Sequence, residues 1–285
     1  MIVVTAATGQ LGQLIVDGLL GAVPAEQIAV AVRNPDKAAG LAARGVVVRA
    51  ADYDDPASLR AAFADADQVL FISGAGVPER EGQHLRVVEA IKAANVRQVV
   101  YTSVLHSDTS TLLVSPDHKV TEKAILDAGI PYTFLRNGWY TENFTTRIQA
   151  ALHTGTVVGN ATPTATLASA TRIDYAQAAV AALTGDGHLN KVYELAGDVE
   201  WSYPDLAAEL SKQTGQQISY QQLTSAEHEK LLIEAGVPAG FAAVLVHTDE
   251  AIGAGELSDD SGDLRNLIGR PTTPLADAVA DLIKG

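Results

Sequence analysis

The first half of the chain alternates short apolar, β-branched runs with longer stretches in which apolar residues recur every three to four positions. The short runs predict strands and the periodic stretches predict helices. The predicted strands are Ile2–Thr5, Ile28–Val32, Val46–Ala50, Gln68–Ile72, Gln98–Thr102 and Tyr132–Arg136. The predicted helices between them are Gln10–Leu20, Asp36–Ala43, Pro56–Ala64, Gln83–Ala94 and Asp117–Ala128.

Strands and helices that alternate with short connections are typical of a parallel sheet with helices on both faces. The run Val99-Val100-Tyr101 is apolar without interruption, as in strands that are buried on both sides. We therefore predict an α/β fold built on a doubly wound parallel Rossmann sheet.

The regular alternation of predicted strands and helices ends near residue 150. The elements predicted beyond it are helices at Tyr175–Leu183, Pro204–Gln213 and Ala226–Ala235 and a strand at Val192–Leu195. We predict a dinucleotide-binding Rossmann domain over residues 1–150 and a smaller C-terminal α/β substrate domain over residues 151–285. Part of this second half is expected to return to the main sheet.

A glycine-containing loop joins the first predicted strand to the first predicted helix. Gly9 and Gly12 keep a G-x-x-G spacing. In dinucleotide-binding turns one such glycine lets the backbone approach the pyrophosphate, and the other lets the helix pack on the strand. Free N–H groups at the start of the helix would hold the phosphates. The candidate cofactor contacts in this loop are Ala6, Thr8, Gly9, Gln10, Leu11 and Gly12.

Ala6 occupies the position at which such turns usually carry their first glycine. If the backbone needs a positive φ there, alanine is strained; if the backbone is extended, only the bulk of the methyl group matters. We expect cofactor binding to survive, but to be weaker than with glycine.

The end of the second strand indicates which dinucleotide binds. An acidic residue at this position would bind a ribose 2′-hydroxyl and mark NAD. Arg33 stands there instead, with Lys37 one helical turn later, and two cations suit a 2′-phosphate. The alternative is a solvated pair on a surface turn. We predict NADPH. Asp52, after the third strand, either accepts a hydrogen bond from the adenine amino group or caps a helix.

Composition narrows the class of partner. The chain has 20 Lys and Arg against 34 Asp and Glu, a net charge of −14 that disfavours nucleic acid and anionic membranes and favours a small molecule. It has no cysteine, which excludes disulfides and thiolate chemistry, and its seven histidines lack metal-ligand spacing. We expect no metal. Met1 leads directly into a strand, and no apolar run reaches the roughly 18 residues of a membrane span. We expect a soluble cytoplasmic protein, with a homodimer as its candidate assembly.

Over nearly its full length the chain resembles the NmrA-like, atypical short-chain dehydrogenase/reductase family. The matching stretches include ATGQLG, VRNPDKA, ADYDD, LFISG, YTSVLHSDTS and GIPYTFLRNGWYTENF. Within the family it is most similar to bacterial NADPH:quinone oxidoreductase and next to triphenylmethane dye reductase. The resemblance implies that NADPH is the direct hydride donor, with no flavin. It also implies further cofactor contacts at Tyr53, Ser73, Gly74, Lys123, Asn137, Gly138 and Trp139.

Typical short-chain reductases carry a serine at the end of the fifth strand and a Tyr-x-x-x-Lys motif on the next helix. Ser103 and Lys123 match two of these residues, but Lys119 replaces the tyrosine. Ketone reduction forms a strongly basic alkoxide and needs an acid nearby. Quinone reduction forms a hydroquinone anion, whose conjugate acid resembles tyrosine with a pKa of about 10. The missing phenol therefore favours a quinone or a similar planar, electron-poor acceptor.

Several other side chains are candidates for the chemistry. His118 either donates a hydrogen bond to a quinone oxygen or packs near the start of its helix. Lys123 either contacts the nicotinamide ribose or pairs with Glu122 at the surface. Gly138 would let the backbone approach the nicotinamide. The catalytic candidates are Ser103, His118, Lys123 and Tyr140; the candidates for acceptor binding are Trp139, Tyr140, Asn143 and Phe241.

Two alternatives stay open at this point. Ala6 and the missing tyrosine also suit a non-catalytic NADP(H)-binding redox sensor that acts through a protein partner. Among enzymes, a reductase of dyes, imines or enones is the other reading. Trp139 has a structural alternative as well, as part of the core between the two halves.

Overall fold

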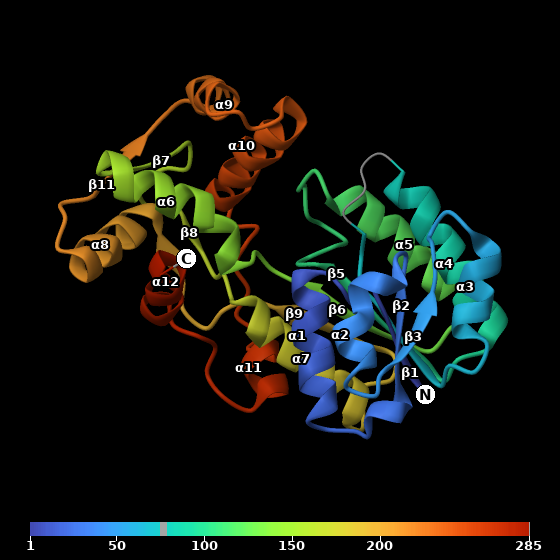
Figure 1. Cartoon of the computed structure of the whole chain (residues 1–285). Coiled ribbons are helices and arrows are strands. Elements are labelled where there is room, and N and C mark those ends of the chain that lie inside the picture. Colours follow the sequence, from blue (N-terminus) through green and yellow to red (C-terminus); the bar gives the residue numbers. More distant parts are fainter. Residues whose placement is uncertain (75–78, 285) are drawn as a thin grey trace.

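The computed structural model describes residues 1–74 and 79–284. Its centre is a parallel seven-stranded sheet with the order β3-β2-β1-β4-β5-β6-β9 (Figure 1). The strands are β1 (Ile2–Thr5), β2 (Ile28–Val32), β3 (Val47–Ala50), β4 (Gln68–Phe71), β5 (Gln98–Val104), β6 (Tyr132–Asn137) and β9 (Lys191–Leu195). The residues of β1, β2, β4 and β5 are all buried, as their uninterrupted apolar runs predicted.

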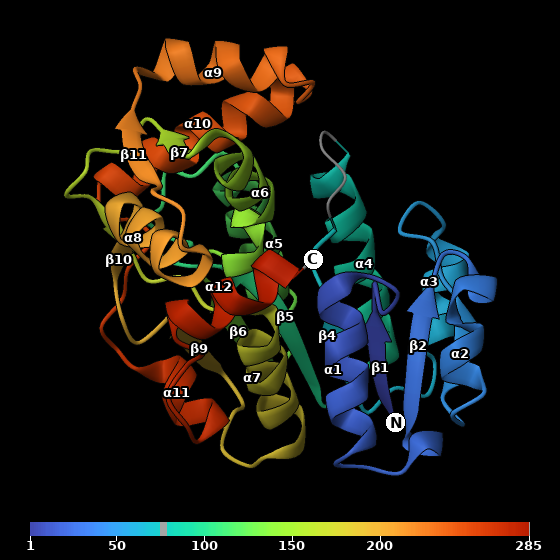
Figure 2. The same cartoon turned by 60° about the vertical axis from the view of Figure 1, so that its left-hand side comes forward.

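Helices cover both faces of the sheet (Figures 1 and 2). One face packs against α1 (Gln10–Leu20) and α7 (Arg172–Thr184), with α11 (Asp263–Ile268) beside α7. The other face packs against α3 (Pro56–Phe63), α4 (Arg80–Ala94) and α5 (Ser115–Asp127). The predicted doubly wound α/β fold is confirmed.

One predicted helix has a different form. The stretch that was predicted as a helix over residues 36–43 consists of a 3₁₀ turn, η2 (Pro35–Ala38), and a short helix, α2 (Ala39–Ala42). The Asn34 side chain accepts a hydrogen bond from the Asp36 N–H, and this local cap starts the tighter turn.

The second half of the chain has a core of its own. It contains α6 (Thr145–Thr154), α8 (Tyr203–Thr214), α9 (Ser225–Glu234), α10 (Ala239–Gly253) and α12 (Leu275–Lys284). Two small sheets join them: β7 (Thr156–Gly159) pairs with β11 (Ser219–Gln222), and β8 (Thr166–Leu167) pairs with β10 (Trp201–Ser202). This half lies beside the main sheet, on the left of Figure 2.

The predicted return of the chain to the main sheet is also present. The segments α7, β9 and α11 follow residue 150 in sequence, yet they pack with the first half, and β9 pairs with β6. Among the described residues, no helix combines the length and the apolar character that crossing a membrane requires.

Candidate cofactor and acceptor site

The sheet has one point at which its strand order reverses, between β1 and β4. In doubly wound sheets, ligands bind in the crevice outside the carboxyl ends of the strands at such a point. The loop that contains Gly9 and Gly12 follows β1 and opens α1, so it lies at this crevice.

The loop is closely packed against the start of α1. The Gly9 N–H donates to the Ala6 carbonyl at 3.0 Å, which closes a tight turn. A methyl group at Gly12 would lie 2.5 Å from the Ala6 carbonyl oxygen and 2.7 Å from Ala7 Cα. Gly12 therefore has the predicted role of letting helix and strand approach. No described side chain caps the N-terminus of α1, and its first turn has no acidic residue, so its N–H groups can receive phosphate.

Ala6 has the positive φ that the sequence analysis considered, at 49°. For residues other than glycine, the left-handed region costs roughly 1–2 kcal/mol. The backbone of the turn is therefore strained at Ala6, in addition to any effect that the bulk of its methyl group has on cofactor binding.

We expect Ala6→Gly to raise the free energy of unfolding by roughly 0.5–1 kcal/mol, because the relief of strain exceeds the extra chain entropy of glycine. Urea unfolding of both proteins measures this difference. Ala7→Gly is the control: Ala7 is fully buried and lacks a positive φ, so glycine there should be destabilising. Loss of stability in both variants would show that Ala6 is not strained.

The two cations after β2 are exposed. Neither Arg33 nor Lys37 forms an ion pair or a side-chain hydrogen bond with another residue in the ranges 1–74 and 79–284. Both are therefore available to an anion. Asp52 does not cap α3: its carboxylate accepts from the Asp54 N–H, and Asp55 is the cap of that helix.

The residues after β4 form the other wall of the crevice. Tyr53 packs edge-on against Phe71 and donates its hydroxyl to the Ile72 carbonyl at 3.1 Å. The Ser73 N–H donates to Thr102 Oγ1 at 2.9 Å. The Gly74 N–H donates to His84 Nε2 at 3.0 Å.

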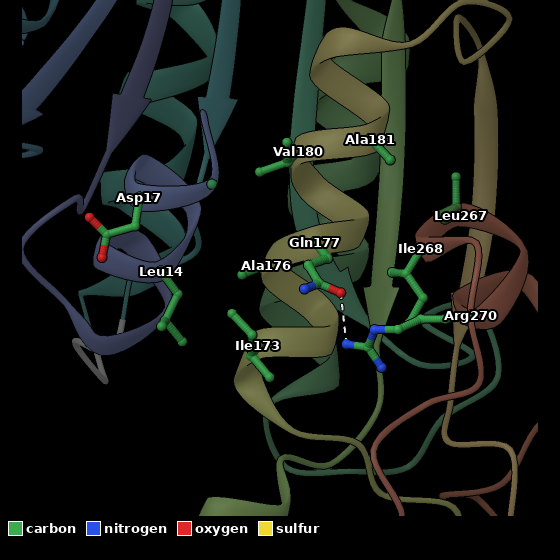
Figure 3. A pocket seen from close by; sticks show the side chains of 11 residues that line it. Leu14, Asp17, Ile173, Ala176, Gln177, Val180, Ala181, Leu267, Ile268 and Arg270 are labelled. Atoms are coloured by element: carbon green, nitrogen blue, oxygen red, sulfur yellow. Dashed lines mark hydrogen bonds between the residues drawn. The ribbon is translucent and has the colours of Figure 1, made fainter. Parts of the chain in front are cut away.

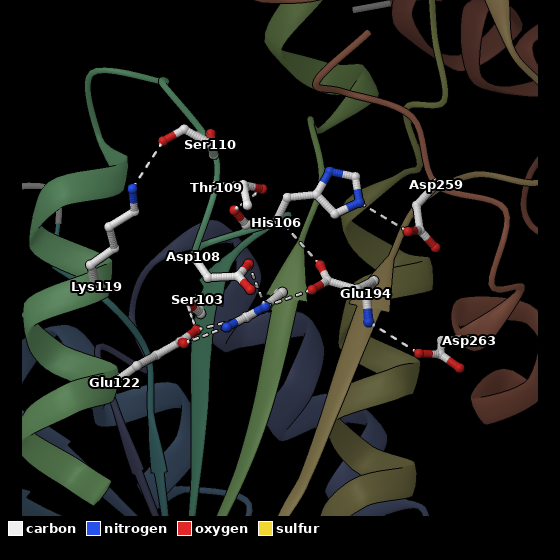
Figure 4. A network of polar contacts seen from close by, with 11 residues as sticks. Ser103, His106, Asp108, Thr109, Ser110, Lys119, Glu122, Glu194, Asp259 and Asp263 are labelled. Atoms are coloured by element: carbon white, nitrogen blue, oxygen red, sulfur yellow. Dashed lines mark hydrogen bonds and ion pairs between the residues drawn. The ribbon is translucent and has the colours of Figure 1, made fainter. Parts of the chain in front are cut away.

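A network of charges fixes the carboxyl ends of β5, β6 and β9 (Figure 4). Ser103 Oγ donates to Glu122 Oε1 at 2.5 Å. Arg136 binds both oxygens of Glu122, at 3.0 and 2.8 Å, and donates to Glu194 at 2.7 Å. Ser103 is thus already engaged by a carboxylate, which argues against our prediction that its hydroxyl serves the reacting acceptor.

His118 and Lys123 do not have the predicted catalytic placement. His118 is buried, with Nδ1 2.7 Å from the Tyr101 hydroxyl. Burial, and next the nearby Arg80, lower the pKa of His118 to about 3, so the ring is neutral and packs in the core. Lys123 is exposed and pairs with Asp127 at 2.6 Å, one turn along the same helix, and not with Glu122. Its side chain therefore belongs to the surface and not to a ribose site.

Tyr140, just after β6, is the last of the four predicted catalytic residues, and it carries a phenol. Its oxygen accepts from Asn137 Nδ2 at 3.2 Å, and its ring packs against Tyr175 and under the Arg172 guanidinium. Burial raises the pKa of Tyr140, so the phenol keeps its proton at neutral pH. Among the described residues, the Tyr140 hydroxyl accepts from Asn137 but donates to no other group, so its hydrogen is available to a ligand.

Asn137 and Gly138 lie between this phenol and β9. Asn137 Oδ1 is buried and has no hydrogen-bond partner in the part of the chain that the structure describes. The Gly138 N–H donates to the Leu195 carbonyl at 2.8 Å. A methyl group at Gly138 would lie 3.1 Å from the Tyr175 hydroxyl, so this glycine serves packing on the protein side.

The predicted acceptor-binding residues have diverse surroundings. Trp139 packs against the core of the second half, which is its structural alternative. Asn143 Oδ1 accepts from Arg172 at 2.9 Å. Phe241 is 56% exposed in the first turn of α10.

His106 and its partners form a cluster that no motif in the sequence indicates. His106 has a positive φ of 51°; its N–H donates to Glu194 at 2.8 Å, and its Nε2 lies 2.9 Å from Asp259 (Figure 4). Burial and acceptor contacts shift the pKa of Asp259 in opposite directions, and the net shift is downward. These contacts join residues more than eighty positions apart, so no local pattern reveals them.

A surface groove of about 730 Å³ lies elsewhere, between α1, α7 and α11 (Figure 3). Its α1 residues, Leu14, Asp17 and Gly18, come after the first turn of the helix, away from the glycine loop. This groove is not part of the crevice. In residues 1–74 and 79–284, no three His, Asp or Glu side chains are grouped so that they could hold a metal ion.

Comparison with known proteins supplies the family. A family model described as the NmrA-like family matches residues 1–269. The chain belongs to the NmrA-like family. It is 48% identical to quinone oxidoreductase 2 of Escherichia coli, over 99% of this chain and 98% of that protein.

Two solved structures extend this likeness to three dimensions. The NADPH-dependent quinone oxidoreductase of Escherichia coli, complexed with NADPH, has a TM-score of 0.97 at 48% identity, covering 99% of this chain and 100% of that one. Triphenylmethane reductase of a Citrobacter species, complexed with NADP(H), has a TM-score of 0.95 at 40% identity, covering 99% and 100%.

The residues of this chain fit the same dinucleotide. In residues 1–74 and 79–284, no side chain caps the start of α1 and none pairs with Arg33 or Lys37. These N–H groups and cations, with the close packing at Gly12, suit the phosphates of the dinucleotide. The unpartnered Asn137 Oδ1 is an acceptor that an amide or hydroxyl of a bound ligand can satisfy. Arg33, Lys37 and Asn137 would therefore hold the cofactor together with the loop over residues 6–12.

Proposed function

We propose that the protein is an NADPH-dependent oxidoreductase that passes hydride directly to a quinone or a similar planar, electron-poor acceptor. The observation that carries this proposal is the start of α1, where the described residues provide no side-chain cap and no acidic side chain. The chain also carries Arg33 and Lys37 after β2 and is 48% identical to a quinone oxidoreductase over 99% of its length. The cofactor supplies the hydride when it is bound.

The residues of the chain explain why the acceptor must be easy to reduce. Lys119 replaces the usual phenol, and Ser103 is bonded to Glu122. Tyr140 is the remaining phenol, with a free O–H and a raised pKa, so it can donate a hydrogen bond to an acceptor oxygen but is a weak acid. A hydroquinone anion needs no stronger acid, whereas an alkoxide does.

The charge of the chain supports the same kind of partner. A net charge of −14 disfavours binding to nucleic acid, so we propose a small, flat acceptor as the partner and no nucleic acid. The apolar side chains that we propose for its walls are the exposed Phe241 and the part of Trp139 that its packing against the core of the second half leaves accessible.

Preference for NADPH over NADH should reside in Arg33. Arg33→Ala is expected to weaken NADPH binding about ten- to a hundredfold, since losing a hydrogen bond to a charged group costs roughly 1.5–3 kcal/mol. NADH lacks the 2′-phosphate and should bind both proteins almost equally. Calorimetric titration of both cofactors measures this, with Lys37→Ala as a second variant of smaller effect. Equal weakening of NADH and NADPH would refute the assignment of the phosphate to Arg33.

A further inference from the structure

The segment Ile72-Ser73-Gly74 leaves β4 at the point where the strand order reverses. Its strand lies between β1 and β5 in the sheet. The segment therefore faces the glycine loop across the ligand crevice. It has passed the end of the strand, so the sheet no longer holds its backbone.

Side chains hold this backbone instead. Four different elements or loops contribute, and each bond goes to a main-chain group. At Ile72, the N–H donates to Thr5 Oγ1 at 3.0 Å and the carbonyl accepts from the Tyr53 hydroxyl at 3.1 Å. The Ser73 N–H donates to Thr102 Oγ1 at 2.9 Å. At Gly74, the N–H donates to His84 Nε2 at 3.0 Å and the carbonyl accepts from Arg80 Nη1 at 3.5 Å.

Of these side chains, His84 is the one whose hydrogen bonds depend most on its protonation state. Its Nε2 accepts from the Gly74 N–H, so this nitrogen carries no hydrogen. Its Nδ1 then carries the hydrogen and donates to Thr121 Oγ1 at 2.9 Å. The Thr121 hydroxyl in turn donates to the Asp117 carbonyl at 2.6 Å. Only a neutral imidazole can make both contacts.

The surroundings of His84 keep the ring neutral and fixed. The side chain is fully buried, and its ring packs edge-on against Phe71, with centroids 4.9 Å apart. Burial, and next the charge of Arg80, lower the pKa of His84 to about 4. Arg80 is itself held by Asp117 at 2.7 Å.

We propose that His84 is a positioning residue for the cofactor: through the Gly74 peptide it fixes the segment 72–74 in the conformation that the bound dinucleotide contacts. This inference rests on the proposed NADPH-dependent function. His84 does not touch the reacting atoms; it acts through the backbone that lines the crevice.

Calorimetric titration with NADPH tests the proposal on the full-length protein. His84→Leu removes the acceptor and is expected to raise the Kd about tenfold, as for a buried N–H left unsatisfied. His84→Gln offers a side-chain oxygen to the Gly74 N–H and should restore most of the affinity. If the leucine variant does not fold, Thr121→Val provides the test: it frees the ring to turn and should raise the Kd by a few fold.

Tyr101→Phe is the matched control. It removes the hydrogen bond to His118 in the same core, and so lowers stability, but it leaves Gly74 untouched. Its Kd should stay within about twofold of the wild type. If His84→Leu loses stability as Tyr101→Phe does and keeps the wild-type Kd, the role of His84 is structural only and the proposal is wrong. If the wild type itself does not bind NADPH, the proposed function fails, and this inference with it.

Discussion

Replacing Arg136 by methionine is expected to lower the free energy of unfolding by about 3–5 kcal/mol, the usual cost of removing one partner from a buried ion pair. The side chains of Arg136 and Glu122 are only 12% and 8% exposed. Arg136 also pairs with Glu194 at 2.7 Å and with the exposed Asp108 at 3.1 Å, so its loss leaves three carboxylates without their common cation. The effect should extend to the site, because Ser103 donates to the same Glu122.

Urea unfolding of Arg136→Met and of a surface counterpart measures this cost. Arg97→Met is the counterpart: Arg97 pairs with Asp67, and both side chains are about half exposed. Removing that pair should cost no more than about 1 kcal/mol. A loss for Arg136→Met as small as that for Arg97→Met would contradict the reading of the network as a buried unit.

Lowering the pH from 7 to 5 is expected to reduce the free energy of unfolding by roughly 4 kcal/mol. In the folded protein the pKa values of His84 and His118 lie at about 4 and about 3, against 6.5 for an unperturbed histidine. The unfolded chain therefore takes up protons first as the pH falls through 6.5, and stability is lost until the folded-state pKa values are reached. Each histidine contributes about half of the loss by pH 5.

Urea unfolding at both pH values checks this expectation. A double variant, His84→Gln with His118→Gln, should lose the share of the pH dependence that these two residues cause, because above pH 5 unperturbed carboxyl groups stay ionised. Burial also lowers the pKa of His228, so a smaller loss of stability in the same direction should persist in the double variant. His153→Gln is the control, since His153 is exposed, and it should behave as the wild type does. The same pH dependence in the double variant and the wild type would mean that other groups cause it.

The sequence predicted the sheet well because the information is local. Apolar runs, glycine spacing and the apolar period of the helices gave β1, β2 and α1 with the bounds that the structure shows. The positions of Arg33 and Gly12 could also be predicted, because each lies a fixed number of residues after the end of a strand.

Side-chain roles on α5 could not be predicted in this way. The Tyr-x-x-x-Lys spacing assigns Lys123 to the site, yet the rotation of the helix turns Glu122 toward Ser103 and leaves Lys123 at the surface. That rotation depends on how α5 packs beside α4 and against the sheet, which no local pattern encodes. For His118 the structure bears out the second of the two alternatives, packing near the start of its helix.

Contacts between residues far apart in the sequence could not be predicted either. Arg136 pairs with Glu194, 58 residues later. The function of His84 depends on the Gly74 peptide and on a tautomer set by Thr121. Ala6 could be predicted only in part. Its place in the glycine loop indicated that φ matters there, but only the structure shows that φ is positive.

The central claim, direct hydride transfer from NADPH to a quinone, is tested by mixing flavin-free protein with NADPH and benzoquinone without oxygen, and comparing NADPH consumed with hydroquinone formed. We expect equal amounts of the two, at a rate far above that of the same mixture without protein, and little turnover of cyclohexanone. Tight binding of NADPH with no acceleration for any quinone would contradict it and would identify the protein as a binding sensor.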